Sequence, residues 1–497
     1  MRGTILGLAL VLGATGVGAQ ERAPDFEAAL GWLVRHQHED GGWRAAAWEE
    51  RCEEAGCKGP GAAAGEARYD VGVSALALLA LVEGGHTRSE GAHSASVAKG
   101  VEFLRAQQRE QDGAIGFRYD YLGEQIYNHA VATQALCALL ERGDEALRGP
   151  CERAVAFCLE AQNPGLGWKY GVRSGRNDTS VTTWMIQALS RAWRAGVEVP
   201  PTAFEHAHTW LERATARDGV AGYETPGGGS STYAANDGKF DPLPTMTAAA
   251  LLGRRLCEQV RARREVVDRR DAQQALVLAA PPSWPADSTR TCNFYYWYMG
   301  ARGLAAASTA ASAEGWTPWR ARLSAALGVH QRVGGCADGS WDPVGEWCLV
   351  GGRVLATALN ALSVAQLSGR SAEPVASRVL ARSEFATAGD YGFEVGYASA
   401  EHEVLRVYVN SPAGFPRQPP PEAKGEVLAS VQVKGWKTPR EYSAKLVALE
   451  PAEVDGHVRY GFEATLKARS GWEEGTVQVS LEGLGPTPLV FRVPFLP

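Results

Sequence analysis

The sequence predicts a mainly α protein: six helical hairpins closed into an (α/α)6 toroid, followed by a small C-terminal antiparallel β-sandwich. Three observations support this prediction. A glutamine-to-aromatic turn recurs along the first three quarters of the chain, an apolar helical segment follows each turn, and the last part of the chain alternates apolar and polar residues at every second position.

The recurring turn combines a glutamine, a glycine-rich stretch and an aromatic residue. It reads QHEDGGW at 37–43, QQREQDGAIGF at 107–117, QNPGLGW at 162–168 and QRVGGCADGSW at 331–341, with weaker copies at 218–223 and 281–284. A spacing of roughly 50 to 70 residues is typical of a hairpin repeat that cannot bury its apolar face alone. Closure into a ring would bury both ends of such a stack.

The clearest unit covers residues 154–192. Its first part has apolar residues at helical spacing, and Pro164 ends that helix because proline cannot continue the hydrogen-bond ladder. A second helix, apolar nearly all round, begins after Asp178, whose carboxylate can accept the free N–H groups of a first turn. We therefore expect the moderately polar helix outside the ring and the apolar helix inside.

The N-terminus has the pattern of a cleavable secretion signal over residues 1–19, with one arginine, an apolar run too short to span a bilayer, and small residues at its end. We therefore expect a secreted or periplasmic protein with no membrane span in the mature chain. The net charge of −6 excludes a strongly basic surface, so nucleic acid is not an expected partner.

Nine cysteines in an exported chain favour disulfides. Cys52 and Cys57 bracket one polar loop, and Cys336 and Cys348 bracket another, so each pair could close a short ring. No Cys-x-x-Cys pair is present, so the sequence predicts neither a metal site nor a cofactor.

The toroid is expected over residues 25–370 and the sandwich over 383–497. Alternating segments in the second region lie at 403–409, 426–433, 442–449, 458–466, 476–481 and 489–493, with prolines and glycines between them. This pattern is typical of antiparallel strands.

The Gln…Asp-Gly-Gly-Trp and Gln…Asp-Gly-Ser-Trp units resemble the QW repeats of squalene cyclases and the repeats of protein prenyltransferase β subunits. Further segments resemble exported bacterial members of this prenyltransferase and squalene-oxidase repeat group: 70–87, 127–136, 177–189, 245–252, 293–300 and 338–359. The resemblance implies an α/α toroid with a central cavity. It implies little about activity.

The catalytic motifs of the related enzymes are missing. The sequence contains no Asp-Asp pair, so it lacks both the Asp-x-Asp-Asp acid of the cyclases and the DDxxD motif of magnesium-dependent terpene synthases. The thioester Cys-Gly-Glu-Gln of complement-type toroids is also absent. Whether the protein is an enzyme is therefore left open by the sequence.

The first turns of the apolar helices supply the candidate site. If these helices run in one direction, their N-termini meet at one mouth. The candidates are Asp178, Asp70 and His129 for catalysis and Arg353, Tyr296, Tyr127, Trp297 and Asn128 for ligand binding. The alternative is that these residues have structural roles: the aspartates as helix caps, His129 as a packed, hydrogen-bonded histidine, and the aromatic residues as part of the wall. Arg353 opposes the helix dipole, so we expect it to contact an anion, with Asp178 or Asp70 as its protein partner.

Three functions remain open. The first is a binding toroid that takes an apolar or anion-tipped ligand, or a protein partner, into its central funnel. The second is a cyclase-like or transferase-like enzyme acting on a terpenoid or polyprenyl (isoprenoid) substrate, with Asp178 or Asp70 as the acid. The third is a polysaccharide lyase or hydrolase that binds a glycan on the same fold.

Overall fold

The computed structural model describes residues 22–369 apart from 53–56, 58–64, 117–123, 228–243, 261–268, 286–291 and 306–312, together with the strands between 386 and 495. The expected signal segment, residues 1–19, lies outside the described residues.

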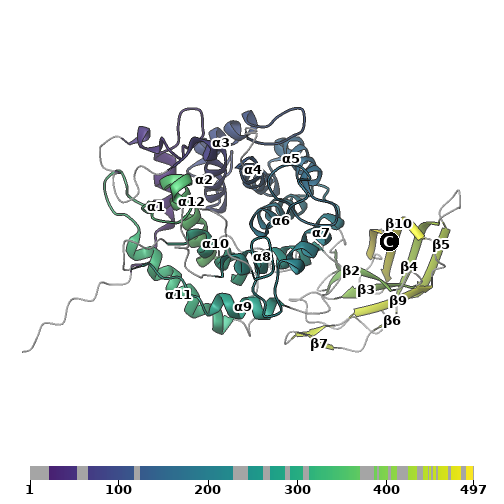
Figure 1. Cartoon of the computed structure of the whole chain (residues 1–497). Helices are drawn as coiled ribbons and strands as arrows, with labels where there is room; N and C mark the ends of the chain where they lie inside the picture. Colours follow the sequence, from purple (N-terminus) through teal and green to yellow (C-terminus); the bar gives the residue numbers. More distant parts are fainter. Residues whose placement is uncertain are drawn as a thin grey trace, which may run out of the picture.

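The described part of the chain contains twelve α-helices that alternate between an outer and an inner layer (Figure 1). The outer helices are α1 (Phe26–Arg35), α3 (Ser94–Ala106), α5 (Arg148–Ala161), α7 (Pro201–Arg213), α9 (Arg270–Leu278) and α11 (Ala313–His330). The inner helices are α2 (Asp70–Glu83), α4 (Glu124–Glu141), α6 (Thr179–Arg194), α8 (Thr245–Val260), α10 (Phe294–Ala305) and α12 (Cys348–Leu367). Short 3-10 helices lie at η1 (Trp48–Arg51), η3 (Ala67–Tyr69) and η4 (Glu145–Leu147).

The inner helices form a closed ring. Each packs against the next along the chain, and α12 packs against α2, which closes the circle (Figure 1). Tyr127 of α4 and Tyr295 of α10 both contact Ser180 of α6, so the N-termini of these helices meet at one end. The expected ring of hairpins with inner helices of one direction is confirmed.

The recurring turn has a structural explanation. Its tryptophan donates an indole N–H back to the preceding outer helix, as Trp43 does to the carbonyl of Leu33 and Trp168 to that of Cys158, each at 2.7 Å. Its glutamine bridges two segments: the Gln162 amide donates to Leu166 in its own turn and to Ala203 in the next outer helix, each at 2.9 Å. The turn therefore joins each hairpin to the next.

The same bonds close the ring between its first and last hairpins. Gln331 Nε2 donates to the carbonyl of Gly339 at 2.9 Å and to the carbonyl of Asp25 at 2.7 Å. Asp25 lies 306 residues before Gln331 in the chain. Gly339 has a φ of +87°, and a Cβ there would lie 1.9 Å from the Ala28 carbonyl oxygen. Only glycine allows this approach of turn and helix.

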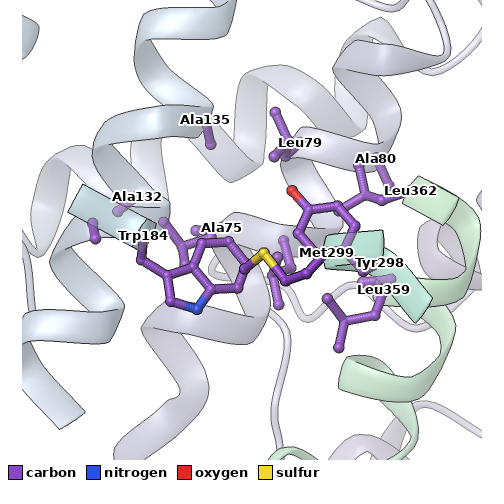
Figure 2. Close-up of a cluster of buried hydrophobic side chains, with 14 of the residues drawn as sticks. Ala75, Leu79, Ala80, Ala132, Ala135, Trp184, Tyr298, Met299, Leu359 and Leu362 are labelled. Carbon is purple, nitrogen blue, oxygen red and sulfur yellow. The ribbon is translucent and has the colours of Figure 1, made fainter. Parts of the chain in front are cut away.

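The centre of the ring is packed with side chains. Figure 2 shows Trp184 of α6, Tyr298 and Met299 of α10 and leucines of α2 and α12 meeting among the small Ala75, Ala132 and Ala135. Trp184 is 6% exposed and Tyr298 1% exposed. Burial of this apolar surface accounts for the all-round apolarity of the inner helices.

Helix α12 also has the length and mean hydropathy of a membrane span. Its apolar window is 89% buried within the structure. Its position among the other inner helices therefore explains its composition.

The C-terminal region contains the expected strands. They are β1 (Ala386–Ala388), β2 (Tyr391–Ala400), β3 (Val404–Asn410), β4 (Lys424–Val433), β5 (Arg440–Lys445), β6 (Val447–Ala448), β7 (Ala452–Val454), β8 (His457–Arg459), β9 (Gly461–Lys467), β10 (Trp472–Glu482) and β11 (Leu489–Phe495).

These strands form antiparallel sheets in the orders β1-β2-β3-β9-β6 and β11-β10-β4-β5, with β7 paired to β8. The alternating segments of the sequence are therefore strands. Their packing as a two-layer sandwich stays a prediction.

Candidate functional site

The N-terminal mouth of the ring contains a network of hydroxyl groups. Tyr127 donates to Ser180 Oγ at 3.0 Å, and Ser180 Oγ lies 3.0 Å from the Tyr295 hydroxyl. Burial raises the pKa of both tyrosines above the ordinary value, so their hydroxyls remain protonated donors. The network joins α4, α6 and α10 across the mouth.

Asp178 caps α6 beside this network. Its Oδ1 accepts a hydrogen bond from Val181 N at 2.7 Å, as the sequence predicts for an N-cap. The residue is fully buried, and Oδ2 has no hydrogen bond of ordinary geometry within the described residues. Burial raises the pKa of Asp178 to about 7, against the opposing effects of the Val181 amide, Lys169 and Tyr223. Near neutral pH this carboxyl can therefore give or take a proton.

Two tyrosines from neighbouring turns complete the mouth. The hydroxyls of Tyr170 and Tyr223 lie 2.7 Å apart, and Lys169 Nζ lies 5.4 Å from the centre of each ring. Lys169 also pairs with Glu224. Burial tends to raise the pKa of Glu224, but the ion pairs with Lys169 and Arg176 hold it below the ordinary value. Tyr170 remains 40% exposed, so this cluster reaches the surface.

Tyr170, Tyr223, Ser180 and Glu224 belong to this site but were not predicted from the sequence. The available signal was that Tyr170 lies two residues after one recurring turn, which ends at Trp168, and that Tyr223 ends the next turn. Because successive hairpins are neighbours in a ring, residues near the ends of two successive turns can lie close together.

Several of the first-turn candidates face away from the mouth, toward the turn of their own hairpin. Asp70 Oδ1 accepts from Ala45 N at 2.8 Å, and burial raises the pKa of Asp70 to about 6. His129 Nδ1 accepts from Ile115 N at 3.0 Å, and its Nε2 lies 3.1 Å from the Ala154 carbonyl. Neither residue joins the Asp178 cluster: Asp70 stabilises its own hairpin, and His129 also links α4 to α5 of the next hairpin.

Tyr296, a predicted ligand-binding residue, shows the same outward orientation. It donates to the carbonyls of Val277 and Ala280, at 3.2 and 2.6 Å, and Thr247 Oγ1 in the first turn of α8 likewise accepts from Ala221 N. A helix turns about 100° per residue, so Tyr295 and Tyr298 point inward when Tyr296 points outward. The expectation that the first-turn candidates meet at one mouth therefore does not hold for Asp70, His129 and Tyr296.

Arg353 has a protein partner that the sequence analysis did not identify. The buried guanidinium donates to Asp342 Oδ1 at 2.6 Å and to Ser340 Oγ at 3.0 Å, and it lies over the Trp48 ring. The expectation that Asp178 or Asp70 pairs with Arg353 is wrong. Because Asp342 lies in the turn just before α12, it reaches Arg353 without crossing the ring.

Asn128 and Trp297 are also occupied by packing. Asn128 Nδ2 donates to the Arg68 carbonyl at 2.8 Å, between α4 and η3. Trp297 is 1% exposed and packs against Phe294 and Trp284. Of the five predicted ligand-binding residues, Tyr127 is thus the one placed in the hydroxyl network of the mouth.

Below the mouth, the ring axis carries an aromatic and a polar layer. Trp184 stacks on Tyr298, with ring centres 5.7 Å apart, and Arg302 donates to both the Tyr298 hydroxyl and Gln187. These layers and the packing in Figure 2 fill the inside of the ring with side chains.

The opposite end of the ring carries an ion cluster. Arg191 Nη2 pairs with Glu83 at 2.5 Å, and its Nη1 pairs with Glu141 at 2.7 Å. Arg194 and Arg142 add further pairs to the same two carboxylates. This cluster ties the C-terminal ends of α2, α4 and α6 together.

A second cluster lies where the first and sixth hairpins meet. His36 Nε2 lies 3.6 Å from Cys52 Sγ, 3.4 Å from Cys57 Sγ and 3.5 Å from Cys336 Sγ. Burial lowers the pKa of His36 to about 4, and Arg35 and Arg353 act in the same direction, so the ring is neutral at neutral pH. These four residues are the group in the described chain that could hold a metal.

The predicted Cys52–Cys57 and Cys336–Cys348 disulfides are not formed in this structure, in which all nine cysteines are free. Cys336 lies beside Cys57 and Cys52 rather than forming a bond with Cys348. The sequence prediction considered only cysteines close in the chain. Ring closure brings Cys336 next to cysteines that are almost 300 residues earlier in the chain. The spacing of cysteines within one loop cannot predict such a contact.

Comparison with known proteins gives a family match for the first part of the chain. The model of the squalene-hopene cyclase C-terminal domain matches residues 3–119. No curated protein sequence matches the chain.

Among solved structures, the chain is similar to endoglucanase CelQ from Clostridium thermocellum complexed with cellotetraose. The identity is 11%, the coverage is 96% of this chain and 93% of the other, and the TM-score is 0.37. The same endoglucanase complexed with cellotriose gives 10% identity, the same coverage and a TM-score of 0.38. The match to the squalene-hopene cyclase C-terminal domain thus covers residues 3–119 of the 497, and the closed ring of helical hairpins rests on the packing of the inner helices themselves.

Proposed function

We propose that this toroid binds an uncharged, hydroxyl-rich ligand of the glycan class at its N-terminal mouth, above Asp178. The observation that carries the proposal is the buried Asp178 carboxyl, which lies among four tyrosines and whose Oδ2 makes no hydrogen bond of ordinary geometry within the described residues, although Tyr223 lies close enough to lower its pKa. A ligand hydroxyl can donate to this weakly satisfied oxygen and so gain free energy.

The tyrosines supply the rest of the recognition. Tyr170, which is 40% exposed, can offer part of its ring to the apolar C–H face of a sugar, and the hydroxyls of Tyr170 and Tyr223 can donate to or accept from sugar hydroxyls. Sites of this kind combine apolar faces with a few fixed polar groups.

The structure weighs against the other ligand classes proposed from the sequence. Arg353 was the reason to expect an anion-tipped ligand, and Asp342 already neutralises it. A long isoprenoid chain needs an enclosed apolar space, whereas Trp184, Tyr298 and Met299 occupy the axis below the mouth. A glycan bound near the surface needs neither feature.

A hydrolytic reaction is a second candidate, favoured by the two carboxyls of the mouth. The pKa of Asp178 is raised to about 7, whereas the ion pairs of Glu224 keep its pKa low. Such a divergence between neighbouring carboxyls is the pattern of an acid and a base in glycoside hydrolysis. Asp178 would protonate the leaving oxygen, and the Glu224 carboxylate would act as the base or the stabilising anion.

A glycan array of neutral oligosaccharides, followed by calorimetric titration of the best binder, tests the proposal. Asp178→Asn and Tyr170→Ala should each weaken binding about tenfold, which corresponds to roughly 1.4 kcal/mol. Val329→Ala is the matched control, because Val329 is an exposed apolar residue on α11 and should leave affinity unchanged.

Two results would overturn the proposal: no binding to any neutral glycan by folded protein, or binding that survives both mouth substitutions. The hydrolytic candidate has its own test in the release of reducing ends. Asp178→Asn and Glu224→Gln should each abolish that release, and a wild-type protein that binds but does not cleave would leave only the binding function.

A further inference from the structure

The cluster of His36 and three cysteines has the dimensions of a metal centre. The four ligand atoms lie within 4.8 Å of one another, and the three N–S distances are 3.4 to 3.6 Å. Tetrahedral zinc with Zn–S near 2.3 Å and Zn–N near 2.0–2.1 Å requires N–S edges of about 3.5 Å and S–S edges of about 3.8 Å. The three observed N–S distances fit these edges, and the sulfurs lie within 4.8 Å of one another.

The orientation of His36 fits the same role. Its Nδ1 lies 2.9 Å from the Trp32 carbonyl, and the ring stacks on the Trp32 indole at 4.1 Å between centres. A carbonyl oxygen can only accept, so Nδ1 carries the proton and Nε2 presents its lone pair to the three sulfurs. A second hydrogen bond of this kind is what normally orients a zinc-bound histidine.

The charges around the cluster are also complementary. Three thiolates, a neutral imidazole and a divalent ion sum to one negative charge. The positive charges of Arg35 and Arg51 lie near His36. Buried negative charge needs such compensation.

We propose that His36, Cys52, Cys57 and Cys336 bind one zinc ion that locks the seam between the first and sixth hairpins. Three sulfurs and one nitrogen in a tetrahedron suit zinc, and four protein ligands make a closed structural site rather than a catalytic one. The ion would link the first and sixth hairpins more strongly than the Gln331–Asp25 hydrogen bonds alone. This inference does not depend on what the mouth binds.

A disulfide is the competing chemistry for these thiols. A Cys52–Cys57 bond would use two sulfurs, leave Cys336 as a free thiol and give His36 Nε2 no partner of comparable strength. The zinc site uses all four groups, and bound zinc would also protect the thiolates from oxidation outside the cytoplasm.

Metal analysis of the purified full-length protein tests the site. We expect one zinc per chain in the wild type, and less than a tenth of that in Cys336→Ala and His36→Ala. Cys292→Ala is the matched control, because Cys292 is a buried thiol outside the cluster and its loss should leave the zinc content unchanged.

Wild-type protein provides a test even if these variants fail to fold. Zinc removed by a chelator and replaced with cobalt should give a thiolate-to-cobalt charge-transfer band and intense tetrahedral d–d bands. Removal should also lower the melting temperature by about 5 °C or more and speed hydrogen exchange at residues 331–342, but not at the Arg88–Asp144 contact.

The proposal fails if folded wild-type protein carries no zinc and takes up no cobalt. It also fails if peptide mapping finds a Cys52–Cys57 disulfide, or if Cys336→Ala retains full zinc content. Stoichiometric copper in place of zinc would overturn the choice of metal.

Discussion

Arg353 at the start of α12 and Asp342 in the preceding turn form a buried ion pair, with Nη2 and Oδ1 2.6 Å apart. Arg353 is fully buried and also lies over Trp48 of the first hairpin. The cation that suggested an anionic ligand is therefore part of the ring's own structure.

Asp342→Ala should lower the free energy of unfolding by about 3 to 5 kcal/mol, because it leaves the Arg353 guanidinium buried without its carboxylate. The double variant Arg353→Met/Asp342→Ala should recover part of this loss. Urea unfolding of the four proteins in the cycle measures the coupling. Additive losses would show that the pair is not coupled.

Asp178→Asn should make stability less sensitive to rising pH. The folded pKa of Asp178 is raised from 3.8 to about 7, so between these values the folded state binds more protons and wild-type stability falls as pH rises. The contribution is up to about 4 kcal/mol. Asparagine keeps the capping acceptor, so unfolding at pH 5 and pH 8 should show a relative gain for the variant at pH 8. Parallel curves would contradict this prediction.

His129 should lower the stability of the folded protein at acidic pH, whereas Asp178 lowers it as the pH rises. Burial lowers its pKa from 6.5 to about 3, so between those values the unfolded state binds more protons and stability falls as pH is lowered. His129→Asn should reduce this acid sensitivity, which is about 5 kcal/mol at most. It should also cost about 2 kcal/mol at pH 7, because the bond to the Ala154 carbonyl is lost.

Arg191→Met should destabilise the ring by about 3 kcal/mol. It removes the charge shared by Glu83, which is 5% exposed, and Glu141. Arg173→Met is the control, because its pair with Glu160 is exposed and should contribute less than about 1 kcal/mol. Equal losses in thermal unfolding would count against a special role for the buried cluster.

Gln162→Ala and Gln331→Ala should cost similar amounts, about 1 to 3 kcal/mol each, since each removes an amide that bridges two hairpins. Gln331 bridges the seam, so its loss should also expose the Asp25 region to proteolysis. Limited digestion distinguishes the two variants, and identical cleavage patterns would contradict the seam assignment.

The sequence was sufficient to predict the ring, because the turn repeats and the apolar helices follow from local patterns. Gln331 and Trp341 repeat the roles of Gln162 and Trp168, so one hairpin predicts the others. The cap formed by Asp178 was predictable for the same reason: it depends on three consecutive residues.

The rest could not be predicted because it depends on helix rotation and on ring closure. Nothing local to Tyr296 says that it faces α9 while Tyr295 faces the mouth. Likewise, no spacing rule connects His36 to Cys336. Both contacts depend on the radius of the ring and on how each helix is rotated about its own axis. The packing of all six hairpins together determines these two quantities.

The seam has a consequence for biosynthesis. Asp25 and His36 leave the ribosome first, but their partners Gln331 and Cys336 follow some 300 residues later. Until then the open side of the first hairpin has no neighbour and its apolar edge is available to chaperones or to other nascent chains. The last hairpin to be translated thus decides when the molecule becomes resistant to aggregation.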